Sequence, residues 1–181
     1  MKTHDYKKAL SYYLESLSDM GKNLNSNNIA SYYEIATDFV VIMHKLASND
    51  INKNNSIKVH LENFIEKISE DMKTYDDHIL KQKASMFKFM LAKVLKNLHH
   101  EKKEVNPASI YKLLEESLKL SKEVIGRFKE LRNDDLIKEE KEVLSQICYE
   151  IGNYYEDIES QPDFAEKAYV ESLNNDGKSE K

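Results

Sequence analysis

Apolar residues recur at three- and four-residue spacings along most of the chain, with polar residues between them. This spacing places the apolar side chains on one face of an α-helix. Short polar segments interrupt the pattern, which therefore predicts an all-α fold of about seven antiparallel amphipathic helices. The predicted helices cover residues 5–24, 29–47, 56–74, 78–100, 107–132, 137–158 and 162–173.

Capping residues support several of these boundaries. Asn106-Pro107 combines an N-cap residue with proline at the first helical position. Thr74-Tyr75-Asp76-Asp77 has the form of a capping box and predicts a break there. The alternative is one helix over residues 56–100, about 65 Å long at 1.5 Å per residue. Gly126 and Gly152 lie inside predicted helices, where close packing of a neighbouring helix would explain each of them.

The run Phe39-Val40-Val41-Ile42-Met43 is apolar on nearly every side of its helix, which predicts that residues 29–47 form the most central element. Ile68 and Ile151 lie in the middle of apolar stripes and are expected in the core. Cys148, the single cysteine, is expected to be a buried core residue.

The 181 residues include only two prolines and four glycines, and strand signals are missing. The length fits one domain, which we place at residues 1–173, followed by a disordered polar tail at 174–181. The first residues lack the apolar segment of a secretory signal, and no apolar run is long enough to span a membrane. We therefore expect a cytoplasmic protein, with a nuclear location left open.

The motifs of common catalytic and metal sites are missing from the sequence. There is no phosphate-binding glycine loop and no Gly-x-Ser-x-Gly nucleophile motif. His99-His100-Glu101 with Glu104 offers metal-ligand residue types, but a solvated helix end is the better interpretation. We expect no enzyme activity, no bound metal and no cofactor.

The charge pattern is the most informative feature. Residues 78–100 contain five lysines and no acid, whereas residues 134–171 contain twelve acids and three lysines. Lys81, Lys88, Lys96 and His99 fall on one arc of their helix, opposite its apolar face, and are the candidate partner-binding residues. Nucleic acid is an unfavourable ligand, since the net charge is −5 and the chain has only two arginines. This basic stripe either contacts an acidic partner or pairs with an acidic helix of the same chain.

A short phrase occurs in three helices. Residues 9–17 (Ala-Leu-Ser-Tyr-Tyr-Leu-Glu-Ser-Leu) match residues 165–173 (Ala-Glu-Lys-Ala-Tyr-Val-Glu-Ser-Leu), and residues 110–118 are a looser copy. Ile151-Gly152-Asn153-Tyr154-Tyr155 precedes the second copy across a turn that contains Pro162. Residues 143–175 therefore resemble one helical hairpin of a tetratricopeptide repeat (TPR) protein.

The order of segments is also similar to that of the 14-3-3 family, itself a stack of antiparallel helices. The similarity lies in residues 84–93, in residues 113–123 and in the junction from Tyr154 to Ala165. It implies phosphopeptide binding, but the family's Arg-Tyr pair is replaced here by Asn97 and Leu98. Lysine does not reproduce the bidentate arginine contact with phosphate.

These observations predict a protein–protein interaction module, an adaptor or a complex subunit, that binds an acidic or phosphorylated peptide in a helical groove. The alternatives are a divergent 14-3-3-like protein and a structural subunit of an obligate oligomer, such as a homodimer, without a peptide groove.

Overall fold

The computed structural model describes residues 3–47, 50–75, 77–102 and 105–176. Over these ranges the chain forms seven helices and no strand, and 88% of the residues are helical. That share is more than twice the roughly 30–35% of an average soluble protein, which confirms the all-α prediction. The helices are α1 (Thr3–Gly21), α2 (Ile29–Ala47), α3 (Ile51–Thr74), α4 (His78–Lys102), α5 (Pro107–Glu130), α6 (Asp134–Asp157) and α7 (Pro162–Asn175).

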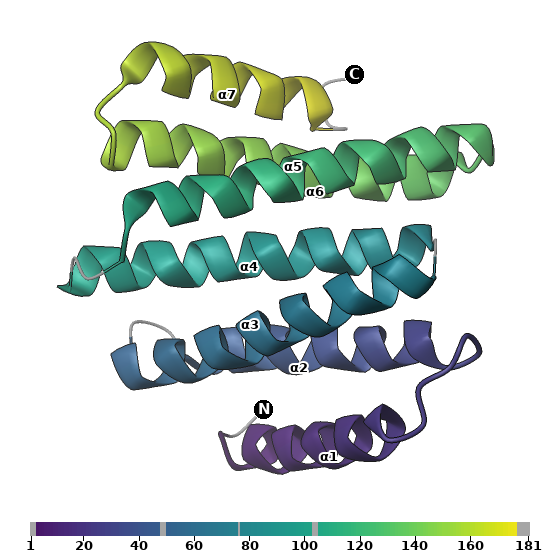
Figure 1. Cartoon of the computed structure of the whole chain (residues 1–181). Helices are drawn as coiled ribbons and strands as arrows, with labels where there is room; N and C mark the ends of the chain where they lie inside the picture. Colours follow the sequence, from purple (N-terminus) through teal and green to yellow (C-terminus); the bar gives the residue numbers. More distant parts are fainter. Residues whose placement is uncertain (1–2, 48–49, 76, 103–104, 177–181) are drawn as a thin grey trace.

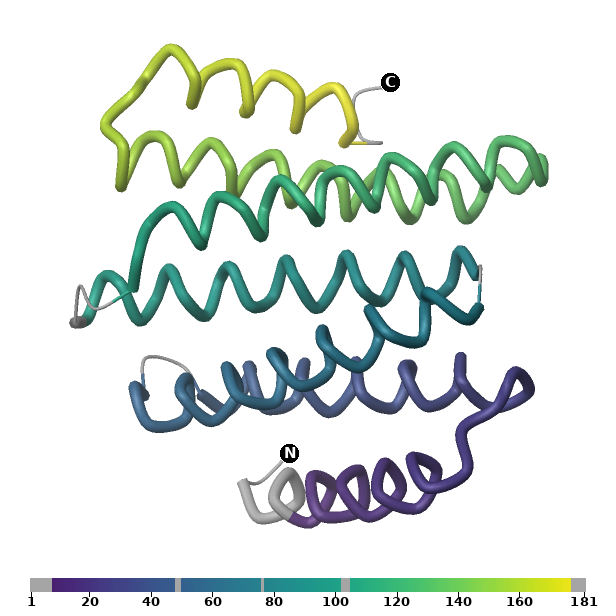
Figure 2. Tube along the Cα trace, in the orientation of Figure 1, coloured from purple at the N-terminus to yellow at the C-terminus, as the bar shows by residue number. Residues whose placement is uncertain are grey.

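The helices form an elongated stack, with consecutive helices packed against each other (Figure 1). α3 lies in front of α2, α5 lies in front of α6, and α4 runs between these two pairs. The described chain starts at one end of the stack with α1 and finishes at the other with α7 (Figure 2). Residues 177–181 of the predicted tail lie outside the described residues, and α7 extends two residues beyond 173.

The predicted helix breaks are confirmed where capping residues mark them. The Asn106 side chain accepts a hydrogen bond from the Ala108 amide at 3.0 Å, and Pro107 opens α5. α3 ends at Thr74 and α4 begins at His78, so the single long helix over residues 56–100 is wrong. The predicted capping box is not formed: the Asp77 carboxylate, not the Thr74 hydroxyl, accepts an amide, that of Ile79 at 2.8 Å.

α3 begins at Ile51, before the predicted start at Ser56. Residues 51–55 are helical rather than a polar loop, because Asp50 caps the helix: its carboxylate accepts the amides of Asn52 and Lys53 at 3.0 and 3.2 Å. The Lys53 ammonium also donates to the Leu46 carbonyl at the end of α2. Polar residues with low helix propensity therefore begin a helix here because the cap satisfies its free amides.

The central element is α4, not α2. Val41, Ile42 and Met43 of α2 are only partly buried, whereas α4 is buried over most of its circumference. Phe87 of α4 stacks on Phe64 of α3 at 5.5 Å between ring centroids. Contacts with α2, α3 and α5 surround α4. The prediction that Ile68, Cys148 and Ile151 are core residues is confirmed, since all three are buried.

The expectation that close packing explains the two helical glycines is confirmed at Gly152 in the α6–α7 hairpin and is wrong at Gly126 of α5. A Cβ atom at Gly152 would lie 2.3 Å from a ring carbon of Tyr169, so only glycine permits this approach. The Tyr169 hydroxyl then donates to Asn153 at 3.0 Å and to Glu156 at 2.6 Å. At Gly126 nothing lies within 4 Å of an added Cβ, so close packing does not explain that glycine.

Alanine substitutions at these two glycines should therefore have opposite effects. Gly152→Ala is expected to lower the free energy of unfolding by about 1–3 kcal/mol, because the Tyr169 ring must leave its site. Gly126→Ala is expected to raise it by about 0.5–1 kcal/mol, because glycine costs that much inside an exposed helix. Urea denaturation followed by circular dichroism measures both. A loss of stability at both sites would show that α5 also has a close neighbour at Gly126.

Candidate functional site

Two lysines of the predicted basic stripe are paired with acids of the same chain. The Lys88 ammonium lies 2.5 Å from the Glu116 carboxylate of α5, and the Lys96 ammonium lies 2.7 Å from the Glu150 carboxylate of α6. The lysine side chains are only 15% and 16% exposed. Lys93 approaches the other Glu150 oxygen at 3.8 Å.

The remaining two candidates also have contacts within the chain. Lys81 lies 3.6 Å from Glu123 of α5, and both side chains are more than one-third exposed. The His99 Nδ1 atom is 2.9 Å from the Val105 carbonyl oxygen, at the turn into α5. The stripe therefore does not form an open basic surface. Its acids come from α5 as well as from α6, whereas the sequence pointed only to the acidic sixth helix.

These ion pairs explain how α4 becomes central despite its lysines. The lysine stems cover apolar surface and their ammonium groups reach carboxylates on the two following helices. A helix with a broad polar arc is thereby enclosed on both sides. This pairing is the internal one of the two alternatives that the charge pattern left open.

Glu140 of α6 is a fully buried carboxylate that the sequence patterns did not single out. It accepts hydrogen bonds from the Ser121 hydroxyl at 2.7 Å and from the Gln82 amide at 2.9 Å. Burial raises the pKa of Glu140, and the two hydrogen bonds and the charge of Lys83 oppose this rise without cancelling it. The available signal was its position on the apolar face of α6, one turn before Leu144.

This raised pKa predicts a pH dependence of stability. Above about pH 4.5 the unfolded chain releases the Glu140 proton, which the folded chain still holds. Stability should therefore fall as the pH rises from the ordinary carboxyl pKa through the raised folded value. Glu140→Gln keeps a neutral group of the same shape, so we expect a gain of about 1 kcal/mol at pH 7 and a flatter profile.

Urea denaturation between pH 4.5 and 7.5 measures this effect, with Glu139→Gln as the exposed neighbouring control. A loss of stability in Glu140→Gln, with the control unchanged, would mean that the charged carboxylate is required in the folded state.

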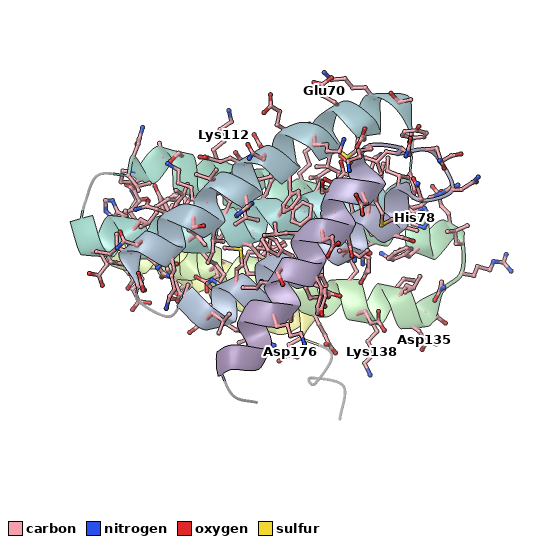
Figure 3. All side chains as sticks on the ribbon, turned by 90° about the horizontal axis from the view of Figure 1, so that it is seen from below. Glu70, His78, Lys112, Asp135, Lys138 and Asp176 are labelled. Atoms are coloured by element: carbon pink, nitrogen blue, oxygen red, sulfur yellow. The ribbon has the colours of Figure 1, made fainter. Side chains whose placement is uncertain are left out.

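A hollow of about 470 Å³ lies between α3 and α5, above α4. We call it the α4 groove. Its floor includes Leu91 and Leu95 of α4 and Leu113 of α5. Its rim carries two helical ion pairs, each at the i, i+4 spacing: Lys58–Glu62 at 3.8 Å and Lys112–Glu116 at 3.9 Å. Figure 3 shows Lys112 extending from the edge of the molecule on which α3 and α5 lie.

The chemistry of the α4 groove is mixed. Its floor is apolar, and its rim presents two lysines and two glutamates. The Lys112 side chain is 75% exposed and its ion pair is long, so its ammonium is accessible to a ligand. Such a groove can accommodate a few side chains of a peptide, with apolar groups inside and charged groups at the rim.

Other classes of site are not found among the described residues. No group of three or more His, Cys, Asp or Glu side chains in that part of the chain is arranged to hold a metal ion. Glu104, part of the histidine cluster considered above, lies outside it. None of the helices described is long and apolar enough to cross a membrane.

Comparison with known families gives one match, which covers residues 1–173. The matched family is described as the fourth ARM domain of tetratricopeptide repeat protein 21. The chain belongs to this family. No curated protein and no solved structure matches the chain significantly.

Membership in the ARM-domain family agrees with the TPR-like interpretation at the level of a helical-repeat protein. It does not support the resemblance to 14-3-3 proteins, which rested on short segments without the phosphate-binding residues. Helical-repeat domains present extended surfaces to other proteins. A role in protein interaction or as a subunit of a complex is therefore the function that this match supports.

Proposed function

We propose that this ARM domain is an interaction module of a protein complex and holds a segment of a partner protein in the α4 groove. The observation that carries the proposal is the family match over residues 1–173, which makes a protein partner the expected ligand. The α4 groove supports it because it combines an apolar floor with accessible charges at its rim.

The rim indicates which segment fits. An apolar side chain enters between Leu95 and Leu113, and acidic side chains on either side of it meet Lys58 and Lys112. The proposed ligand is still the acidic peptide expected from the sequence. The surface proposed to bind it is the rim of the α4 groove rather than the lysine stripe on α4. Because both rim cations are lysines, they act as point charges, and carboxylates suit them as well as phosphates.

A charge-reversal pair tests the proposal. Lys58→Glu with Lys112→Glu changes the rim on α3 and α5, and Lys73→Glu with Lys129→Glu is the matched control on the same two helices. Proteins that co-purify with each tagged chain are quantified by mass spectrometry. We expect the recovered amount of a defined set of proteins to fall about tenfold or more with the rim variant and to stay unchanged with the control variant.

The captured proteins then allow two finer measurements. Binding of their acidic segments should weaken with added salt, since the rim pairs are exposed to solvent. Phosphatase treatment distinguishes carboxylate recognition from phosphate recognition. Equal recovery of every protein by the rim variant and the control would overturn the proposal.

A structural subunit of a homo-oligomer is the second candidate function. Tyr12 and Leu14 of α1 and Val59 of α3 are exposed apolar side chains that a second copy would cover. The molar mass in solution, measured against concentration, separates the two, because an obligate oligomer unfolds as it dissociates. We propose, in addition, that the domain acts in the cytoplasm and catalyses no reaction.

A further inference from the structure

The α6–α7 hairpin carries exposed apolar side chains away from the α4 groove. Tyr149 of α6 is 52% exposed, and Val170 and Leu173 of α7 are 50% and 65% exposed. Val170 and Leu173 lie on adjacent turns, and the Tyr149 ring packs beside Tyr169 at 5.5 Å between centroids. The tyrosine pair thus connects the apolar surface of α6 to that of α7.

The three copies of the repeated phrase allow the surroundings of Leu173 to be compared with those of the equivalent residues in other helices. Leu17 ends the first copy and Leu173 ends the matching copy. Leu17 is only 6% exposed and lies in the core, where α1 packs against α2. Leu118, which ends the looser copy, also packs against the core. The same position is thus buried in α1, partly buried in α5 and 65% exposed in α7.

Acidic residues border this apolar surface on both helices. Glu166 lies one turn before Val170, so Glu166, Val170 and Leu173 share one face of α7 at the i, i+4, i+7 spacing. Glu142 and Glu156 lie two turns either side of Tyr149 on α6. Within the described ranges neither Glu142 nor Glu166 takes part in an ion pair, and both are exposed. The hairpin face consists of Glu142, Tyr149, Glu156, Glu166, Tyr169, Val170 and Leu173, with Lys138 at its edge one turn before Glu142.

We infer that the hairpin face docks an amphipathic helix of a partner protein that carries lysine or arginine beside its apolar stripe. The helical form follows from Leu17, the counterpart of Leu173 in α1, which is buried where α1 packs against α2. The basic flanks follow from the charge of the face. With three glutamates and Lys138, the hairpin face has a formal net charge of −2. A second copy of this chain would bring like charges together, so a basic partner is favoured.

This surface is separate from the α4 groove. Figure 3 shows Lys112, at the rim of the groove, on the opposite edge of the molecule from Lys138 of α6 and Asp176 after α7. The two surfaces can therefore be occupied at the same time, and the inference does not depend on the proposed function.

The test uses the full chain and a synthetic helical probe. The probe is a labelled peptide of about 18 residues with leucine at helix-period positions and lysine elsewhere, and a leucine–glutamate peptide is its counterpart. Fluorescence anisotropy measures the affinity for wild type, for Val170→Ser with Leu173→Ser, and for Glu142→Lys with Glu166→Lys. All four positions are exposed, and circular dichroism verifies that the variants stay folded.

Control variants carry the same changes elsewhere in the chain. They are Val59→Ser with Leu131→Ser, and Glu66→Lys with Glu115→Lys, all at exposed positions. We expect each hairpin-face variant to weaken lysine-peptide binding about tenfold, and each control to change it less than about threefold. Binding should also weaken between low and high salt.

Three results would overturn the inference. The first is equal binding of the lysine and glutamate peptides, which would remove the charge argument. The second is an equal loss in hairpin-face and control variants, which would mean non-specific attraction to an acidic protein. The third is concentration-dependent association of the chain that Val170→Ser with Leu173→Ser abolishes, which would make the occupant a second copy.

Discussion

Phe87→Ala should lower the free energy of unfolding by about 3–5 kcal/mol, one of the largest effects expected of any single substitution in this chain. Phe87 is fully buried in α4. Its ring stacks on Phe64 of α3 at 5.5 Å and lies 6.2 Å from the Tyr33 ring of α2. Truncation removes contacts with both helices and leaves a cavity that three packed helices cannot readily close.

The measurement is equilibrium urea denaturation followed by circular dichroism. Phe87→Leu keeps most of the volume and should lose less than the alanine variant, so it gives a readable value if the latter fails to fold. Tyr12→Ala, an aromatic truncation at an exposed site on α1, is the control and should cost at most about 0.5 kcal/mol. A Phe87→Ala loss below about 1 kcal/mol would contradict the placement of α4 at the centre.

Two of the helix boundaries followed from capping signals in the sequence. Asn106 marks the start of α5 and Asp77 that of α4, because each side chain accepts a free amide of the first turn. The start of α3 was missed because asparagine and lysine at 52–55 have no apolar period, whereas the Asp50 cap depends on side-chain geometry. Capping residues thus predict some helix ends from the sequence, but the absence of an apolar pattern does not exclude a helix.

The position of each helix in the stack was harder to predict. The apolar run of α2 indicated a central element, yet α4 occupies that place with six lysines in its sequence. Periodicity describes each helix alone and contains no information on which neighbour supplies the counter-charges. Likewise, residues 165–173 repeat the phrase of residues 9–17, but Leu173 is exposed because no described helix follows α7 in the stack.

The candidate site shows the same limit. The arc that joins Lys81, Lys88 and Lys96 was predicted from helical spacing, and the structure keeps these residues on one side of α4. Their acids, Glu116 and Glu150 among them, come from helices distant in sequence. The α4 groove was not predictable at residue level, because its lining comes from three helices whose relative placement only the fold provides.

The triple variant Lys81→Glu, Lys88→Glu, Lys96→Glu should lose about 4 kcal/mol or more of folding stability. Lys88 and Lys96 are mostly buried, and breaking one such pair typically costs about 3–5 kcal/mol when the opposite charge stays behind. The reversal also places new carboxylates beside Glu116 and Glu150. Lys81 adds little, since exposed pairs contribute about 0–1 kcal/mol each.

Denaturation of the triple variant is compared with that of Lys73→Glu, Lys129→Glu, Lys167→Glu, which changes the same charge at exposed positions. The control should lose at most about 1 kcal/mol per site. Lys96→Glu combined with Glu150→Lys restores the opposite charges of that pair, so it should recover part of the stability that Lys96→Glu alone loses. The recovery is partial because Lys93 then lies beside a new lysine.

The outcome decides between the two roles left open by the charge pattern. If the lysines form only ion pairs within the chain, partner binding fails in the triple variant only under conditions that also unfold it. A triple variant that keeps wild-type stability but loses its partners would instead mean that the lysines leave their carboxylates for a ligand. The low exposure of both Lys96 and Glu150 argues against that exchange at this pair, because a ligand would have to displace a carboxylate already desolvated beside the Lys96 ammonium.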